Sequence, residues 1–515
     1  MLRNGLAVLF VSLCAIFCVA QQANVLSVGM FTDPPSVDPA LVSSYEEYIV
    51  TANTYETLLK YDLNTWEVVP LLAQAWAVSE DATRATFYLR EGVTFHDGTD
   101  FDAEAVRFSL ERALAIGRAP SAYLSRIKSF EVVGPYEIQM TTDRPWAFWE
   151  DVFACVNALP IVSPSYVKAN ATAADPWATE WMRQHTCGTG AYMLAEWRQG
   201  EYVRLERFAG YWRGWTERNF ETVMVMIVRE PAKQKLYFER GAIDISFGIP
   251  VSEYPKLEAN PGVIVVPVTG LAQRYITMKA DRPPLDDVNV RRAIAYAIQY
   301  ENLPTIRPYA RIAQGPLPHH ALGFNDSIEV SHRDIDKARQ LLSEAGYKPG
   351  DLQLELVYVA GLDFQRDLAV MVQANLAEIG IKLTLRSMPW ATLFPLLSDP
   401  EKSPAMYVFF SAARFGDPHG ILWEMFHPDA LGLAGFNNGY RNAVVGDLLD
   451  QAERETDRDH RADLYREVSR IIAEDQPAVF LWEEPYPQIY RSDLRNIAPD
   501  GLFRTYYFYE IYREN

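Results

Sequence analysis

The chain of 515 residues is too long for one compact core, so its length predicts two or three domains. Hydrophobic residues make up 49% and charged residues 22%, which is the balance of a globular protein and excludes a disordered one. A net charge of −19 and a pI near 5.0, with no cluster of Lys and Arg, exclude nucleic acid as a partner.

The N-terminus has the pattern of a secretory signal peptide. Arg3 precedes an apolar stretch over residues 6–19, and small residues stand at Cys18 and Ala20. We expect cleavage after Ala20 and a mature chain that is soluble in the periplasm. A membrane anchor is the alternative, but a spanning helix needs roughly 20 apolar residues. A lipid anchor at Cys14 or Cys18 fits less well, because a bulky residue precedes each cysteine.

The first half of the mature chain mixes strands and helices. Residues 85–89 alternate as a strand, and Asp102 is placed to cap a helix whose apolar residues recur at helical spacing. Shorter strands are expected at 136–140 and 202–205.

The second half alternates more regularly. A helix is expected after Asp287, and another over residues 334–346, between an Asp cap and a terminal Gly. Residues 352–358, 364–379 and 381–385 then read as strand, helix and strand, which predicts a βαβ unit with a parallel strand pair. The class is therefore α/β, and two lobes with a ligand between them are expected.

Two cysteines remain after signal cleavage. Cys155 and Cys187 form an even pair in an oxidising compartment, so we expect a disulfide between them. Two buried free thiols are the alternative.

Motifs for catalysis are missing from the sequence. It has no G-x-S-x-G elbow, Walker loop, H-E-x-x-H zinc motif or dinucleotide fingerprint, so we expect neither enzymatic activity nor a cofactor or metal. Aromatic residues make up 13% of the chain and suit a pocket that stacks on a ligand. A secreted hydrolase, or a binding protein without a transporter, remains an alternative class.

A series of motifs resembles one known family. The stretch TFYLREGVTFHDGT at 86–99, followed by FDAEAV at 101–106, resembles the signature of the family 5 extracellular solute-binding proteins of peptide, nickel and opine ABC importers. Further matches stand in the order of the family at 37–40, 55–58, 188–192, 210–212, 241–244, 290–298, 338–347, 415–418 and 438–440.

The resemblance implies a two-lobed type II periplasmic-binding-protein fold with an inserted subdomain. The partners would be a small-molecule or peptide ligand and a membrane permease with its ATPase, and the protein would be a monomer. The implied parts are a signal peptide at 1–20, lobe I from 21–70, 190–265 and 485–515, a subdomain at 71–189 and lobe II at 270–484. The two crossings between the lobes would act as hinges.

The resemblance also directs attention to one loop. In the branch that binds peptide amino termini, an Asp lies four residues before the Pro of the D-P motif, and here Arg414 stands there. A guanidinium suits a carboxylate or phosphate rather than an ammonium group. We therefore expect a ligand end that is anionic or neutral, as in a modified peptide, an opine-like or sugar-acid compound or an oligosaccharide. Free-amine peptides remain open if another acid anchors the amine, and Arg414 has a salt bridge within lobe II as its alternative role.

Other candidate ligand-binding residues surround this loop or lie elsewhere in the lobes. Asp417 could accept a hydrogen bond from the ligand, with shaping of the turn as its alternative role, and His419 after D-P resembles the nickel-chelate branch. The candidate stacking surfaces are Trp390, Trp423, Phe31 and Tyr275, each with core packing as its alternative role.

Overall fold

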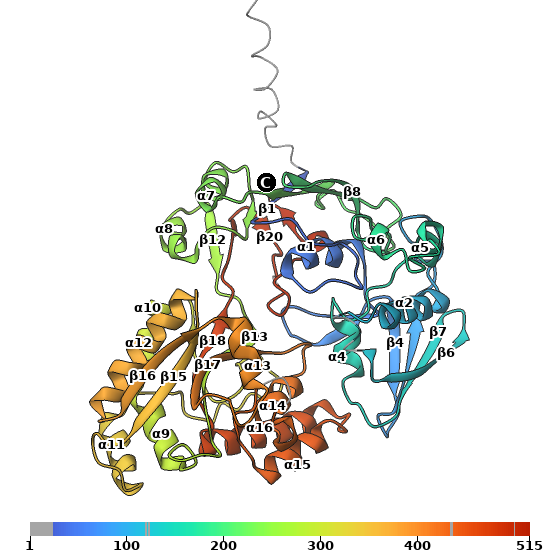
Figure 1. Ribbon diagram of the computed structural model, residues 1–515. Helices are drawn as coiled ribbons and strands as arrows, with labels where there is room; N and C mark the ends of the chain where they lie inside the picture. The colour runs from blue at the N-terminus through green and yellow to red at the C-terminus, as the bar shows by residue number, and fades with distance from the viewer. Residues whose placement is uncertain (1–23, 119–120, 122–123, 433–435, 499, 515) are drawn as a thin grey trace, which may run out of the picture.

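The structure is a computed structural model that describes residues 24–118, 121, 124–432, 436–498 and 500–514. Within these ranges, three sheets of four or more strands organise the chain, and each has its own buried core (Figure 1). No helix in the described part of the chain combines the length and apolar character needed to cross a membrane. The expected signal peptide lies outside the described residues.

The first sheet has seven strands and forms the core of lobe I, at the top of Figure 1. Its strands, in spatial order, are β12 (Val263–Val266), β19 (Gln488–Arg491), β11 (Ile245–Ser246), β1 (Val25–Met30), β10 (Thr222–Ile227), β9 (Tyr202–Arg207) and β8 (Tyr192–Arg198). The helices α1 (Tyr45–Thr54), α7 (Pro231–Glu239), α8 (Tyr254–Glu258), η1 (Val251–Glu253) and η4 (Phe508–Glu510) and the strand pair β20 (Leu494–Arg495) and β21 (Tyr512–Arg513) complete this part. β1 runs parallel to β10 and β11, whereas β19 is antiparallel to β11.

The second sheet is antiparallel and belongs to the subdomain. Its strands are β4 (Ala73–Val78), β5 (Arg84–Leu89), β7 (Glu137–Thr142) and β6 (Ile127–Gly134), and the hairpin β2 (Leu59–Tyr61) and β3 (Val68–Pro70) precedes it. The accompanying helices are α2 (Ala103–Ile116), α4 (Trp149–Ala154), α5 (Pro164–Asn170) and α6 (Thr179–Met182). The predicted cap is confirmed, since the Asp102 carboxylate accepts the backbone N–H of Ala105 at 2.9 Å.

The third sheet forms the core of lobe II. Its strands, in spatial order, are β14 (Arg311–Ile312), β18 (Ala478–Pro485), β13 (Thr269–Met278), β17 (Met406–Ala412), β15 (Gln353–Val359) and β16 (Lys382–Met388). Its helices are α9 (Val288–Ala297), η2 (Tyr300–Asn302), α10 (Leu303–Ile306), α11 (Ile335–Glu344), α12 (Asp363–Glu378), α13 (Trp390–Leu397), α14 (His419–Phe426), η3 (Pro428–Ala430), α15 (Ala443–Ala452) and α16 (Arg458–Asp475). The predicted βαβ unit is confirmed as β15, α12 and β16, whose strands pair in parallel.

Two crossings connect lobe I with lobe II, between β12 and β13 and between β18 and β19. The start of β13 pairs with the ends of β17 and β18, so the carboxyl ends of the parallel strands β15, β16 and β17 lie on the crossing side of lobe II. β19 starts beside the end of β11, which brings the carboxyl ends of β1, β10 and β11 to the same region. The two carboxyl edges therefore meet at the crossings, which is where ligands bind in open α/β sheets.

The predicted disulfide is wrong in this structure, because Cys155 and Cys187 are both buried free thiols. The Sγ of Cys155 lies 3.0 Å from Asn157 Oδ1 and 3.3 Å from the carbonyl oxygen of Arg414. Burial raises the pKa of the Cys187 thiol to about 12. Each thiol is thus a small protonated group inside the protein, and Cys155 joins the subdomain to a loop of lobe II.

Candidate functional site

The carboxyl edge of lobe II carries exposed aromatic side chains. Trp390 begins α13, two residues after the last residue of β16, and Phe410 lies near the end of β17; they are 42% and 43% exposed. Phe394, one turn after Trp390, is 38% exposed, and its ring centroid lies 5.2 Å from that of Trp390. Trp390 also stacks on the buried Phe409, with the ring planes 27° apart. Large exposed apolar groups gathered in one place are typical of a binding surface.

The facing edge of lobe I has a similar character. Phe31 follows β1 and is 46% exposed. Phe247 follows β11, stacks on Tyr45 with centroids 6.1 Å apart, and meets the ring of Tyr506 edge-on at 5.7 Å. Flat side chains on both edges can enclose a ligand from two sides, because their faces stack on peptide planes and aromatic rings.

Charged groups adjoin the aromatic edge of lobe II. Glu484 at the end of β18 accepts hydrogen bonds from Arg274 at 3.0 Å and from Trp482 at 3.2 Å, and it pairs with Arg307 at 2.5 Å. The Arg274 guanidinium also lies 4.8 Å from the ring centroid of Phe410. Burial alone would raise the pKa of Glu484, but the two arginines hold it below its ordinary value. Glu484 is therefore a charged carboxylate whose two oxygens are both already paired with an arginine.

Arg414 lies at the predicted edge, but its charge has a partner. It follows β17, is 53% exposed, and contacts Glu424 of α14 through Nε at 3.1 Å and Nη2 at 3.0 Å. Burial raises the pKa of Glu424, and Arg414 opposes that rise. The alternative role of Arg414, a salt bridge within lobe II, is thus present in the structure.

Asp417 points into the protein, contrary to its predicted contact with the ligand. It is 1% exposed. One oxygen accepts Arg461 Nε at 2.9 Å, and the other accepts the Tyr465 hydroxyl at 2.7 Å and the His419 backbone N–H at 2.8 Å. Arg461 also reaches Asp151 of the subdomain at 3.6 Å. Asp417 therefore joins lobe II to the subdomain and is closed to a ligand.

His419 is enclosed as well. Its ring lies 4.8 Å from that of Phe148 and 6.4 Å from that of Tyr465, and burial lowers its pKa to about 4. Among the described residues, no group of three or more His, Cys, Asp or Glu side chains could hold a metal ion. The prediction that His419 reaches a chelated metal is therefore not supported by its position.

The predicted aromatic residues divide between edge and core. Trp390 and Phe31 are at the edges, as described above. Tyr275 is fully buried and donates its hydroxyl hydrogen to the carbonyl of Pro316 at 3.0 Å. Trp423 is half-buried and stacks on His427, with centroids 5.1 Å apart. The alternative role of Tyr275, core packing, is thus present in the structure.

Several residues of the site were not predicted from the sequence. Phe410, Phe247, Arg274 and Arg307 lie at the strand ends or beside the crossings. The alternation along β17 was the available signal for Phe410, because neighbouring residues of a strand face opposite sides and Phe409 is buried.

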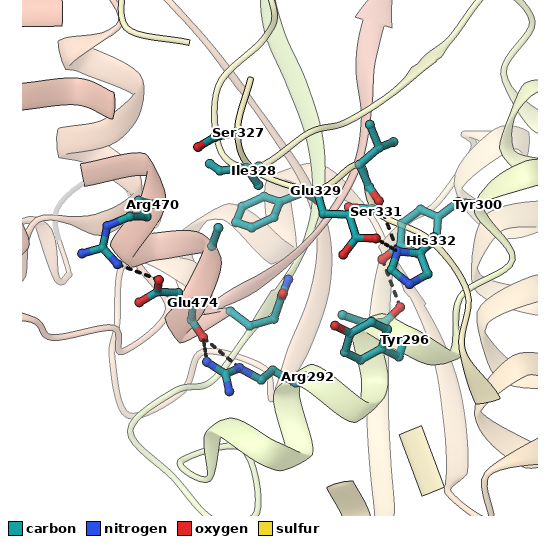
Figure 2. A pocket seen from close by; sticks show the side chains of 16 residues that line it. Arg292, Tyr296, Tyr300, Ser327, Ile328, Glu329, Ser331, His332, Arg470 and Glu474 are labelled. Carbon is teal, nitrogen blue, oxygen red and sulfur yellow. Dashed lines mark hydrogen bonds and ion pairs between the residues drawn. The ribbon is translucent and has the colours of Figure 1, made fainter. Parts of the chain in front are cut away.

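A cavity of about 350 Å³ in lobe II is a second candidate site (Figure 2). It lies between α9, α16 and the segment 327–332, so lobe I takes no part in it. Its charged groups have partners: Arg470 pairs with Glu474 at 2.6 Å, and Arg292 donates to the Glu474 carbonyl at 2.9 Å (Figure 2). Arg470 and Glu474 neutralise each other, and a ligand in this cavity would contact lobe II alone, so the facing edges better fit a ligand that touches both lobes.

Comparisons with known proteins agree over most of the chain. Residues 67–432 match the family described as "Bacterial extracellular solute-binding proteins, family 5 Middle". The "Probable D,D-dipeptide-binding periplasmic protein DdpA" of Escherichia coli K12 is 28% identical over 491 residues, covering 94% of this chain and 93% of the relative. The "Glutathione-binding protein GsiB" of Escherichia coli K12 is 27% identical over 515 residues, covering 97% of each.

Solved structures show the same arrangement of the chain. The periplasmic binding protein DppA from Helicobacter pylori, in complex with peptide STSA, superposes with a TM-score of 0.72 at 26% identity, covering 95% of this chain and 98% of the other. HbpA2 from Haemophilus parasuis gives a TM-score of 0.87 at 23% identity, covering 96% and 100%.

Proposed function

Because the chain belongs to family 5 of the bacterial extracellular solute-binding proteins, we propose that it binds a peptide or peptide-like solute between its lobes and delivers it to an ABC importer. Its fold is the two-lobed type II fold of periplasmic binding proteins. In this role the protein is an exported, non-catalytic carrier, and its partners are the permease and ATPase of the importer. The proteins named above that bind a dipeptide, glutathione or the peptide STSA support a peptide ligand.

One observation supports the proposed location of the ligand. The carboxyl ends of the parallel strands of both lobes meet at the crossings, and each edge exposes aromatic residues: Phe31 in lobe I, and Trp390 and Phe410 in lobe II. A ligand that contacts both edges stabilises the closed arrangement of the lobes, because its binding free energy depends on having both surfaces within reach. The crossings then act as the hinges.

The other ligand classes suggested by the sequence have less support. Arg414 is paired with Glu424, so it is not a free charge that demands an anion. Asp417 is enclosed and so is not available to a free amine. His419 is enclosed as well and so is not available to a metal chelate. A peptide held by stacking and by main-chain hydrogen bonds needs none of these three groups.

The function is tested by identifying and then titrating the ligand. Mass spectrometry of small molecules released from protein purified from its native host should identify a peptide, and calorimetry should then show binding of that peptide, recovered chemically unchanged. Replacing Trp390 by Ala should weaken binding by about tenfold, as expected for the loss of one stacking surface.

The matched control is Trp181→Ala in the subdomain, since Trp181 is also 42% exposed but lies on α6. This control should bind the peptide as the wild type does. Equal binding by both variants would reject the proposed location. Release of a non-peptide solute, or its chemical conversion on the protein, would reject the proposed function.

A further inference from the structure

Three arginines and one carboxylate gather at the crossings. Arg274 on β13 and Arg307 after α10 share Glu484, whose two oxygens they occupy at 3.0 and 2.5 Å. Arg504 comes from the C-terminal segment of lobe I, and its guanidinium carbon lies 3.4 Å from the ring centroid of Tyr486 in the crossing. Glu484 neutralises one of the three positive charges, so the cluster has an excess of two.

Two of these guanidinium groups have unused hydrogen-bonding capacity. Among the residues that the structure describes, Arg504 makes no ion pair, and the buried Nε of Arg307 has no hydrogen-bond partner. Burial lowers the pKa of Arg504 below its ordinary value, with Arg307 adding to the effect. Arg504 is a partly buried cation that makes no ion pair of its own, and an incoming anion would supply the missing partner.

The cluster lies next to the proposed ligand site. Arg274 contacts the rings of Phe410, at 4.8 Å, and Phe364, at 5.2 Å, so the charges continue the aromatic edge of lobe II. On the lobe I side, Tyr45 is near enough to influence the pKa of Arg504, and Tyr45 is also the residue that stacks on Phe247.

The segment that carries Arg504 is held firmly against the crossing. Leu502 packs against the hydrophobic cores of both the subdomain and lobe II. Gly270, at the start of β13, lies so close to Gly501 that a Cβ there would overlap the Gly501 carbonyl oxygen. The arginines are therefore preorganised at the base of the interlobe region, which reduces the entropy lost when they bind an anion.

We propose that Arg307 and Arg504 bind a carboxylate of the peptide, an inference that rests on the peptide-binding function proposed above. A guanidinium presents parallel N–H donors that match the two oxygens of a carboxylate. A peptide carries a carboxylate at its C-terminus and on each Asp or Glu side chain. Arg274, fixed by Glu484 and the two rings, positions the aromatic edge beside the bound carboxylate. The ligand class is thus a peptide with its carboxylate directed to the crossings.

The test is calorimetry with three synthetic peptides: Ala-Ala-Ala, its C-terminal amide, and the amide of Ala-Ala-Glu. Wild-type protein should bind the free acid at least about tenfold more tightly than the plain amide, because the amide lacks the charge that pairs with the guanidinium groups. If a side-chain carboxylate can occupy the site, the Glu amide recovers the affinity; if only the C-terminus can, it does not, and both results agree with the proposal.

Variants separate the carboxylate site from peptide binding in general. Arg504→Gln and Arg307→Gln should lower affinity for the free acid about tenfold and change affinity for the plain amide less than about twofold. Arg504→Lys keeps the charge and should retain part of the preference for the free acid over the plain amide. The control Arg386→Gln, exposed on β16, should bind all three peptides as the wild type does. Urea unfolding of each variant checks that the fold is kept.

Two results would overturn the inference while leaving the proposed function standing. One is wild-type protein that binds the plain amide as tightly as the acid. The other is a pair of Gln variants that weaken acid and amide equally, which would show that the arginines only support the fold. Wild-type protein that binds none of the peptides, together with a non-peptide natural ligand, would refute the peptide function and this inference with it.

Discussion

Replacing Asp417 by Ala tests whether this residue of the D-P motif supports the fold or contacts the ligand. The change removes the carboxylate that pairs with Arg461 at 2.9 Å and accepts the Tyr465 hydroxyl at 2.7 Å. Arg461 is 3% exposed, so its charge would stay buried with only Asp151, 3.6 Å away, as a counter-ion. Removing one partner of a buried ion pair costs about 3–5 kcal/mol, and we expect a loss of unfolding free energy of this size.

The assay is urea unfolding followed by tryptophan fluorescence, alongside calorimetry of peptide binding at a temperature where the variant is folded. Asp463→Ala is the control, because Asp463 is exposed on the same helix and its loss should change stability by less than about 0.5 kcal/mol. In the double variant Asp417→Ala with Arg461→Met both charges are absent, so the combined loss should be smaller than the sum of the single losses. Wild-type stability together with lost peptide affinity in Asp417→Ala would refute the structural role.

Three further predictions follow from buried groups. After unfolding without reductant, Cys155 and Cys187 should both react with a thiol reagent, whereas a mature chain without free thiols would contradict the structure. Burial raises the pKa of Asp500 from 3.8 to about 6, so the folded state holds this proton more tightly and stability should fall by about 2 kcal/mol as pH rises from 4 to 6. Asp500→Asn should remove this part of the pH dependence in urea unfolding, and an unchanged difference between pH 4 and pH 6 would contradict the assignment. Gly270→Ala should lower unfolding free energy by about 1–3 kcal/mol, because the new Cβ meets the Gly501 carbonyl; a variant as stable as the wild type would show that the segment can shift.

Local features of the fold could be predicted from the sequence because their causes lie within a few residues. Asp102, Asp287 and Asp334 cap their helices as expected, since a side-chain oxygen needs only the N–H groups two or three residues ahead. The βαβ unit was predictable for a similar reason. Alternation marks its two strands, and a crossover helix of this length leaves a parallel, right-handed connection as the favoured arrangement.

The candidate site depended on contacts between distant segments. Asp417 stands in a motif that looked functional, yet its partners Arg461 and Tyr465 come from α16, and Phe148 of the subdomain covers the neighbouring His419. The motif and the alternation of residues indicate which side chains share a face. They do not indicate which face another domain will cover.

The sequence by itself determined the class of the fold, its helix caps and its family resemblance, because short-range hydrogen bonds and hydrophobic periodicity are written into neighbouring residues. Only the tertiary structure decided which polar groups are free. Arg414 is paired with Glu424, whereas Arg504, which no motif indicated, has no ion pair among the described residues. The physical reason is that the environment of a charge is set by burial and by counter-ions, and both depend on how the helices and strands pack in the folded protein.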